Sequence, residues 1–349
     1  MPASRWKLIT SVLISLIIIT LAWLNRVWIA EAFALLEEAR PALLAAAFAL
    51  ICLSYLVSGQ VFFVVLHSLG YRLSQLRLWA TALVAIVISQ SVPAGGVGSY
   101  AFLISNFNRR GISQGESALI ASLETLSYAM AMLLMFGFSL IWLAGHGLAT
   151  GGASQIAGLV AIAVIVGAAI ILTRPVTTLT HWLGSIQLAV GRLFGKRWTG
   201  RWAAGLIDEL DRGRKLLASR RRDVVWLVLI QLTALAGHSL AMLLVLQAFD
   251  VSLSMWAVIT AFGIALITST FNVLPGGGGT VEAALVAVLS QLGAGPAAVP
   301  AAIIFRLFNF WLLTPVAGLA YHWLMHEQVS PLVSRHSQLG VRQPPESTG

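Results

Sequence analysis

The sequence contains very little charge. Only 10% of its 349 residues are Asp, Glu, Lys or Arg, whereas 58% are hydrophobic and the mean hydropathy is +0.87. A soluble globular domain carries about 25% charged residues, so this composition excludes a soluble protein and is typical of a chain embedded in a membrane. The chain has one cysteine, Cys52, which excludes a disulfide framework and a metal site built from several cysteines.

Acidic residues are also few. The 13 Asp and Glu residues form no cluster that would hold a metal, and sequences typical of zinc proteases, serine hydrolases and nucleotide-binding P-loops are absent from the sequence. We therefore expect no enzyme activity, no metal site and no cofactor. The lack of a nucleotide-binding motif also excludes an ATP-driven pump within this chain.

Long apolar stretches dominate the sequence. Six of them are long enough to cross about 30 Å of hydrocarbon at about 1.5 Å per residue, namely 7–24, 41–66, 116–143, 152–173, 223–248 and 298–323. Two more, 76–108 and 253–292, are interrupted by Pro/Gly segments, and their arms of about 12–18 residues are short for a full crossing. We therefore expect an all-α polytopic membrane protein with six full spans and two re-entrant helical hairpins, which can be counted as eight membrane helices.

The basic residues support this topology. With the N-terminus inside, 19 of the 22 Lys and Arg residues fall in inside segments, eleven of them in 174–222, while Arg26 and Arg40 fall outside. This distribution obeys the positive-inside rule and places both termini in the cytoplasm. We expect the chain to lie in a bacterial inner membrane. The basic loop 174–222 is typical of an amphipathic element on the anionic leaflet, or of a topology signal alone. We expect one transmembrane domain over 1–325 and a disordered tail over 326–349.

A Pro/Gly segment occurs twice in the chain, 182 positions apart. VPAGGVGS at 92–99 aligns with LPGGGGTV at 274–281, and the same offset without a gap pairs Gly111 with Gly293 and Glu124 with Arg306. A Pro/Gly break followed by a lone charge in both halves is typical of a transporter built from repeats. We expect two inverted repeats, 41–145 and 223–327, with one hairpin entering from each face and a substrate site between them.

The hairpin tips supply the first candidate site residues. Irregular backbone within a membrane survives only where it is buried in protein or lines a wet cavity. The helix after each tip would point its unpaired N–H groups at the midplane, where they favour an anion, although such glycines can also serve only close helix packing. The candidates are Pro93, Gly95, Gly96, Gly98, Asn272, Pro275, Gly276, Gly277, Gly278 and Gly279.

Charged residues inside the spans supply the second group. Arg306 and Glu124 each lie roughly 12 Å into a span, where a charge costs about 2.5–3.5 kcal/mol and needs a partner or a wet cavity. Glu282 falls in the first turn after the second tip. Arg306 either pairs with Glu282 or Glu124, or attracts a phosphate through two parallel hydrogen bonds while the carboxylates balance the empty site. Tyr128 and Asn309 lie one turn beyond the two charges.

The second tip and the span that follows it carry a family resemblance. They resemble the signature of the lysylphosphatidylglycerol synthase transmembrane-region family, and the residues involved are Pro275, Gly276, Gly277, Glu282, Gly293, Arg306, Phe310 and Trp311. The resemblance covers residues 5–325 and implies a flippase-like protein for a phospholipid or polyisoprenoid-linked lipid. Two motifs of the family differ here. Where the family often has a Gly-Glu pair after the first proline, Gly98 is followed by Ser99, and where it has a later Glu-Arg pair, Glu124 is followed by Thr125. No aminoacyltransferase sequence follows residue 325, so lysine transfer is not expected.

These observations leave three functions open. The first is translocation of an anionic phospholipid or polyisoprenoid-linked lipid between the leaflets. The second is secondary transport of a small anion, coupled to protons through Glu124 or Glu282, and the third is a non-transporting scaffold for an envelope enzyme. The expected partners are membrane lipids with an anionic headgroup, with a second copy of the chain and a lipid-modifying enzyme as further candidates. Nucleic acid is not expected.

Overall fold

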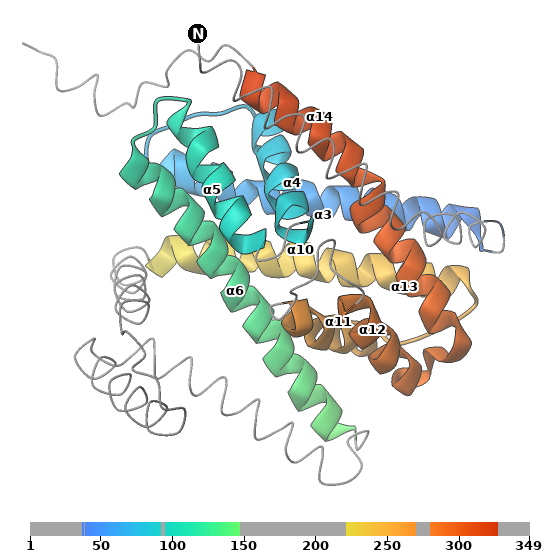
Figure 1. Cartoon of the computed structure of the whole chain (residues 1–349). Helices are drawn as coiled ribbons and strands as arrows, with labels where there is room; N and C mark the ends of the chain where they lie inside the picture. Colours follow the sequence, from blue (N-terminus) through green and yellow to red (C-terminus); the bar gives the residue numbers. More distant parts are fainter. Residues whose placement is uncertain (1–36, 38, 92–94, 147–220, 270–279, 327–349) are drawn as a thin grey trace, which may run out of the picture. The chain divides into compact units, whose positions relative to one another are not determined.

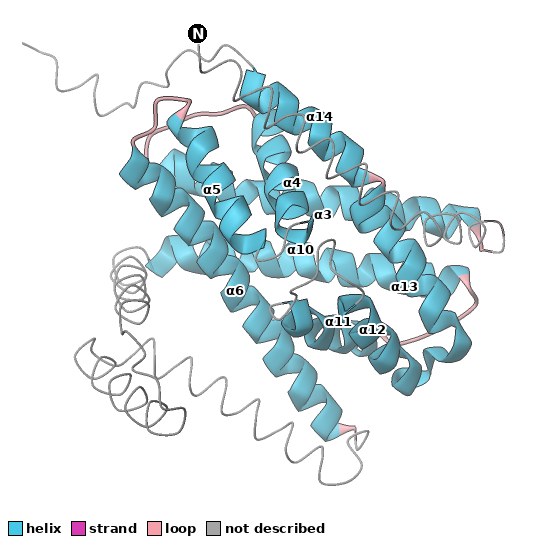
Figure 2. Cartoon of the chain, viewed as in Figure 1, coloured by secondary structure: helices cyan, strands magenta, loops and turns pink. Residues whose placement is uncertain are grey.

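The computed structural model describes residues 37, 39–91, 95–146, 221–269 and 280–326, and all regular structure in these ranges is helical (Figure 2). The predicted spans 7–24 and 152–173 lie outside the described residues, as do most of loop 174–222 and nearly all of tail 326–349. The chain forms two compact units. The first comprises Met1–Ser139 and Leu227–Gly349, and the second comprises Leu140–Trp226.

Nine α-helices are described (Figure 1). In chain order they are α3 (Pro41–Ser68), α4 (Gln75–Ser91), α5 (Gly95–Asn108), α6 (Gln114–Gly145), α10 (Arg221–Ala248), α11 (Met255–Ser269), α12 (Thr280–Leu289), α13 (Ala298–Arg306) and α14 (Leu313–His326). Two π-helical segments, Ser290–Ala294 and Leu307–Trp311, and a 3-10 turn, Gly295–Ala297, connect the last three helices.

Four stretches of the described chain are long and apolar enough to cross a membrane. They are Pro41–Ser68, Gln114–Gly145, Arg222–Ala248 and Val281–His326. The first three match predicted full spans. The fourth contains the predicted span 298–323 together with α12, the outgoing arm of the second predicted hairpin.

The same order of helices occurs twice. Helices α3 and α10 each have 28 residues. Each is followed by two short helices that pack against each other, α4 with α5 and α11 with α12. A longer helical segment then completes each half. The predicted interrupted stretches 76–108 and 253–292 therefore do form helix pairs, while their re-entrant placement in a membrane stays a prediction.

Left-handed backbone positions recur at matching places in the two halves. Gly111 (φ 81°) and Gly293 (φ 105°), which the sequence comparison paired, both adopt this conformation. A second match links Gly70 (φ 83°) after α3 with Asp250 (φ 61°) after α10, at an offset of 180. In both, the amide of the following residue donates to the carbonyl five residues earlier, at 2.9 and 3.1 Å. Asp tolerates the left-handed region better than most residues, so this turn is retained without glycine.

Each helix pair packs against the last helix of the other half. Helix α4 contacts α14, and the rings of Phe102 on α5 and Tyr321 on α14 lie 5.9 Å apart. Reciprocally, α11 approaches α6 at Gly263, where an added Cβ would lie only 2.7 Å from the Met135 carbonyl oxygen. Small residues allow membrane helices to approach this closely. The two halves therefore exchange equivalent contacts, while their inverted relation in a membrane stays a prediction.

Exposure is distributed as in a helix bundle surrounded by lipid. Large apolar side chains are exposed on the long helices, including Leu53 (53%), Leu134 (54%) and Leu319 (75%). Small polar residues such as Ser139 and Thr314 are buried instead. Without a hydrophobic force between helices, small residues and their hydrogen bonds occupy the interior.

Candidate functional site

A partly buried ion pair lies between α12 and α13. Glu282 occupies the first turn of α12, and Arg306 is the last residue of α13. Gly293 and Gly295, both with positive φ, turn the chain so that α12 packs against α13. This brings Arg306 Nη1 to 3.1 Å from Glu282 Oε1, with the two side chains only 17% and 19% exposed. Because both charges have lost most of their hydration, each depends strongly on its partner.

Arg306 also connects this pair to the first half of the chain. Its Nη1 donates to Gln90 Oε1 on α4 at 3.3 Å. Its guanidinium carbon lies 4.4 Å from the centroid of the Phe310 ring, within cation–π range. Glu282 Oε2 is buried and has no hydrogen-bond partner among the described residues. The ion pair therefore retains one acceptor that could receive a further donor.

A π-helical turn follows Arg306 directly. It spans Leu307–Trp311, and the Leu312 amide donates to the Leu307 carbonyl at 2.9 Å. Within this turn, Asn309 receives the hydroxyl of Tyr55 from α3, which lies 2.8 Å from both its backbone oxygen and its Oδ1. Tyr55 is 1% exposed. Single π-helical turns are frequent at functional sites, and here the turn keeps Arg306 and Asn309 next to residues of the first half.

His238 of α10 contacts two aromatic residues next to this site. Its Nδ1 is 2.8 Å from the Ala234 carbonyl of its own helix. Its ring meets those of Tyr55 and Phe305 edge-on, with centroids 5.3 and 6.4 Å away. These contacts agree with the role of a packed core histidine.

Comparison with known proteins gives the family. The chain matches the model of the lysylphosphatidylglycerol synthase TM region over residues 8–317. It belongs to this family. It is therefore an integral multi-pass membrane protein, and the resemblance seen in the sequence is confirmed. It is also similar to a protein described as UPF0104 membrane protein from Methanothermobacter thermautotrophicus, with 22% identity over 261 residues that cover 70% of this chain and 75% of that protein.

In this member of the lysylphosphatidylglycerol synthase TM-region family, one predicted charge pairing is present. The structure joins Arg306 to Glu282, the first of the two carboxylates that the sequence offered. Glu124 lies half-buried in α6 and accepts a hydrogen bond from the Thr125 hydroxyl at 3.2 Å. Tyr128 is half-buried one turn further along α6.

The predicted tip residues are only partly described. Gly95 begins α5, and Gly96 is exposed in its first turn. Gly98 packs closely, since a Cβ there would lie 3.2 Å from Ile88 Cγ2 on α4. The other candidates lie outside the described residues; they are Pro93, Asn272, Pro275, Gly276, Gly277, Gly278 and Gly279.

Tyr55 and Gln90 are site residues that were not among the candidates drawn from the sequence. A hydroxyl near the middle of the 28-residue apolar helix α3 was the available signal, because polar groups at that depth need a partner from another helix.

Proposed function

We propose that this protein translocates an anionic phospholipid or polyisoprenoid-linked lipid between the leaflets of the bacterial inner membrane. In this proposal the headgroup phosphate contacts Arg306 as it passes between two inverted repeats. The tip glycines contribute N–H donors, both termini lie in the cytoplasm, and no reaction is catalysed. Membership of the lysylphosphatidylglycerol synthase TM-region family supports a lipid as substrate.

The observation that carries the proposal is the position of Arg306. It sits where elements of both halves meet, with Glu282 as its counter-ion and Gln90 as its contact in the first half. A guanidinium can donate two parallel hydrogen bonds to a phosphate, so a headgroup can replace the carboxylate as partner. Glu282 then keeps the site neutral when no lipid is bound.

The unused oxygen of Glu282 adds to this chemistry. Because Oε2 is buried without a partner among the described residues, it can accept a hydrogen bond from a hydroxyl or ammonium group of a headgroup. The site thus combines one donor for a phosphate with one acceptor for a polar substituent. Glu124 lies at the matching place in α6, at the offset of 182, and would balance charge in the first half.

Leaflet exchange in proteoliposomes tests the proposal. Fluorescent lipids with anionic and zwitterionic headgroups are incorporated, and dithionite quenches those that reach the outer leaflet. We expect the wild type to exchange anionic headgroups preferentially. Arg306→Ala should slow exchange by about tenfold or more, since a charged hydrogen bond is worth about 1.5–3 kcal/mol.

Arg40→Ala provides the matched control. Arg40 pairs with Asp250 through side chains that are 63% and 72% exposed, so its loss should leave exchange unchanged. Full exchange by Arg306→Ala would overturn the role given to Arg306. If folded wild type exchanges no headgroup but takes up labelled phosphate, small-anion transport replaces lipid translocation. If it does neither, the scaffold function remains.

A further inference from the structure

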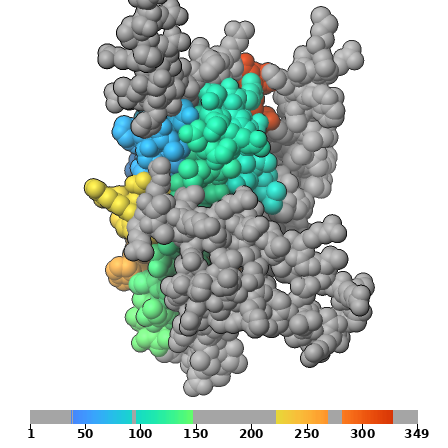
Figure 3. All heavy atoms as spheres, turned by 90° about the vertical axis from the view of Figure 1, so that its left-hand side faces the viewer, coloured from blue at the N-terminus to red at the C-terminus, as the bar shows by residue number. Residues whose placement is uncertain are grey.

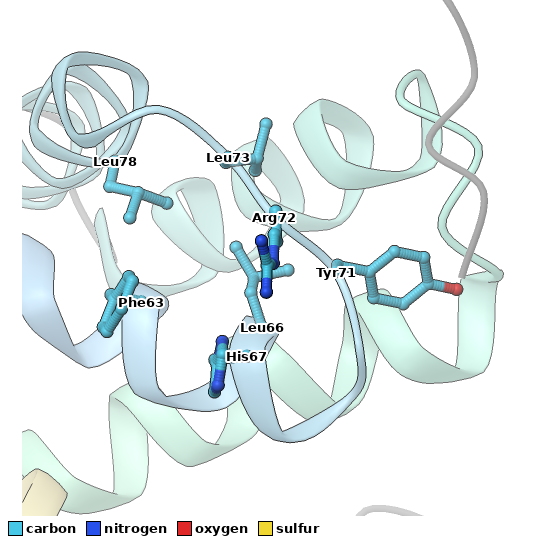
Figure 4. A pocket seen from close by; sticks show the side chains of 7 residues that line it. All are labelled: Phe63, Leu66, His67, Tyr71, Arg72, Leu73 and Leu78. Carbon is cyan, nitrogen blue, oxygen red and sulfur yellow. The ribbon is translucent and has the colours of Figure 1, made fainter. Parts of the chain in front are cut away.

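A cavity of about 240 Å³ lies at the C-terminal end of α3. Its lining residues come from the end of α3, the following turn and the start of α4; they are Phe63, Leu66, His67, Tyr71, Arg72, Leu73 and Leu78. In Figure 4 the side chains of Arg72 and His67 lie between those of Phe63 and Leu78 on one side and Tyr71 on the other. The cavity therefore combines two basic groups with an apolar wall.

The two basic side chains are available to a ligand. Both are exposed, and neither makes a hydrogen bond or ion pair with another side chain in the part of the chain that the structure describes. His67 stacks on Phe63 with centroids 5.7 Å apart, which leaves its ring nitrogens uncovered by that contact. The carboxylate of Glu116 is already engaged, since the Tyr71 hydroxyl donates to it at 3.0 Å. Figure 4 shows this hydroxyl pointing away from Arg72.

A second cavity continues along the same face of α3. It measures about 480 Å³ and is lined by Leu56, Gln60, Gln75, Leu76 and Trp79. Leu56, Gln60, Phe63 and His67 are spaced by four, three and four residues, so they form one stripe on the helix. Gln60 donates to Gln75 of α4 at 3.0 Å and closes one wall. We call the two cavities together the α3–α4 groove.

The groove has the length of one leaflet. From His67 to Leu56 the helix rises about 16 Å at 1.5 Å per residue. Half of a hydrocarbon core of about 30 Å is nearly the same. The end of the groove at His67 and Arg72 is basic. The end at Leu56 is mostly apolar, and Leu76 there is 60% exposed. In Figure 3, atoms of the α3 region (blue) lie beside those of the α5–α6 region (teal to green).

The other half of the chain lacks these basic residues. At the offset of 180 given by the Gly70–Asp250 match, His67 corresponds to Gln247 and Arg72 to Ser252. The apolar residues of the turn are retained, since Leu66 corresponds to Leu246 and Leu73 to Leu253. The fold of this turn therefore does not need the two basic groups, and their presence at one end only gives that end an affinity for anions.

We propose that the α3–α4 groove binds one anionic phospholipid of the adjoining leaflet, with its phosphate at Arg72 and His67 and an acyl chain along Phe63 towards Leu76. This is the cytoplasmic leaflet in the topology proposed above. The lipid recognised is one whose headgroup carries net negative charge. The inference does not depend on lipid exchange and is separate from the Arg306 site.

Native mass spectrometry of the purified full chain tests this site. The probes are dioleoyl phosphatidylglycerol and dioleoyl phosphatidylcholine, added at equal concentration. The variant His67→Gln/Arg72→Ser introduces the residues found at the matching positions of the other half, so it should fold. We expect the wild type to retain one phosphatidylglycerol in preference, and the variant to bind it about tenfold more weakly, equivalent to about 1.4 kcal/mol.

Two controls make the result decisive. The variant His146→Gln/Arg222→Ser removes the same residue types from exposed positions outside the groove and should keep wild-type binding. Soluble glycerophosphoglycerol should compete poorly, because it lacks the acyl chain. Equal binding by the groove variant, an equal loss in the control variant, or competition by the soluble headgroup as strong as by the lipid would each overturn the proposal.

Discussion

The ion pair between Arg306 and Glu282 makes a quantitative prediction about stability. The perturbation is a double-mutant cycle with Arg306→Met and Glu282→Leu, which replace the charges by apolar side chains of similar length. Each single variant leaves one charge in a place where the side chains are only 17% and 19% exposed. Such an uncompensated charge destabilises a protein by about 3–5 kcal/mol.

The double variant should recover most of this loss. With both charges removed, no buried charge remains, and replacing a buried pair by apolar residues is often nearly neutral. The remaining cost is the charged hydrogen bond that Arg306 donates to Gln90, about 1.5–3 kcal/mol. The expected coupling energy between the two positions is therefore several kcal/mol.

Unfolding in mixed micelles with increasing sodium dodecyl sulfate, followed by circular dichroism, measures these free energies. The exposed pair supplies the control cycle, because Arg40→Met and Asp250→Asn, which keeps a residue that tolerates the left-handed backbone, should show a coupling of at most about 1 kcal/mol. The reasoning is refuted if the losses of unfolding free energy in Arg306→Met and Glu282→Leu sum to the loss in the double variant within about 0.5 kcal/mol. Such additivity means that the two charges do not interact.

Three further predictions use the same unfolding assay. Gly237→Ala should destabilise the protein by about 1–3 kcal/mol through overpacking. Adding Ser54→Ala should restore the stability, since only Ser54 obstructs the added Cβ, and a double variant that stays destabilised contradicts this. Gly263→Ala should not be rescued by Ser139→Ala, because the Met135 carbonyl still lies 2.7 Å from the Cβ; recovery would show that α6 shifts. Tyr55→Phe should lower the free energy of unfolding by about 1–3 kcal/mol, because the two oxygens of Asn309 lose their donor. An unchanged stability would show that another group replaces the hydroxyl.

Much of the fold could be predicted from local pattern. Apolar length marked the helices, and the Pro/Gly segments marked the breaks, because both follow from neighbouring residues alone. The Gly111–Gly293 pair was predicted and shares a left-handed backbone. The Gly70–Asp250 pair was missed, since its offset is 180 and a gap-free comparison at 182 cannot detect it.

The candidate site was predicted in its charges but not in its partners. Arg306 and Glu282 stand out in sequence because a charge in an apolar stretch is costly there. Tyr55 and Gln90 do not, because their contacts with residues 309 and 306 join positions 254 and 216 residues apart.

The sequence by itself determined that the chain is a helical membrane protein with a repeated break and a charge in each half, since composition and spacing are local properties. Only the tertiary structure decided that Arg306 pairs with Glu282. That choice depends on the turn at Gly293 and Gly295, which packs α12 against α13. Only the tertiary structure likewise placed Tyr55 of α3 against the π-helical turn. Both are long-range packing outcomes, in which the geometry of whole helices, rather than the identity of neighbouring residues, sets which polar groups meet.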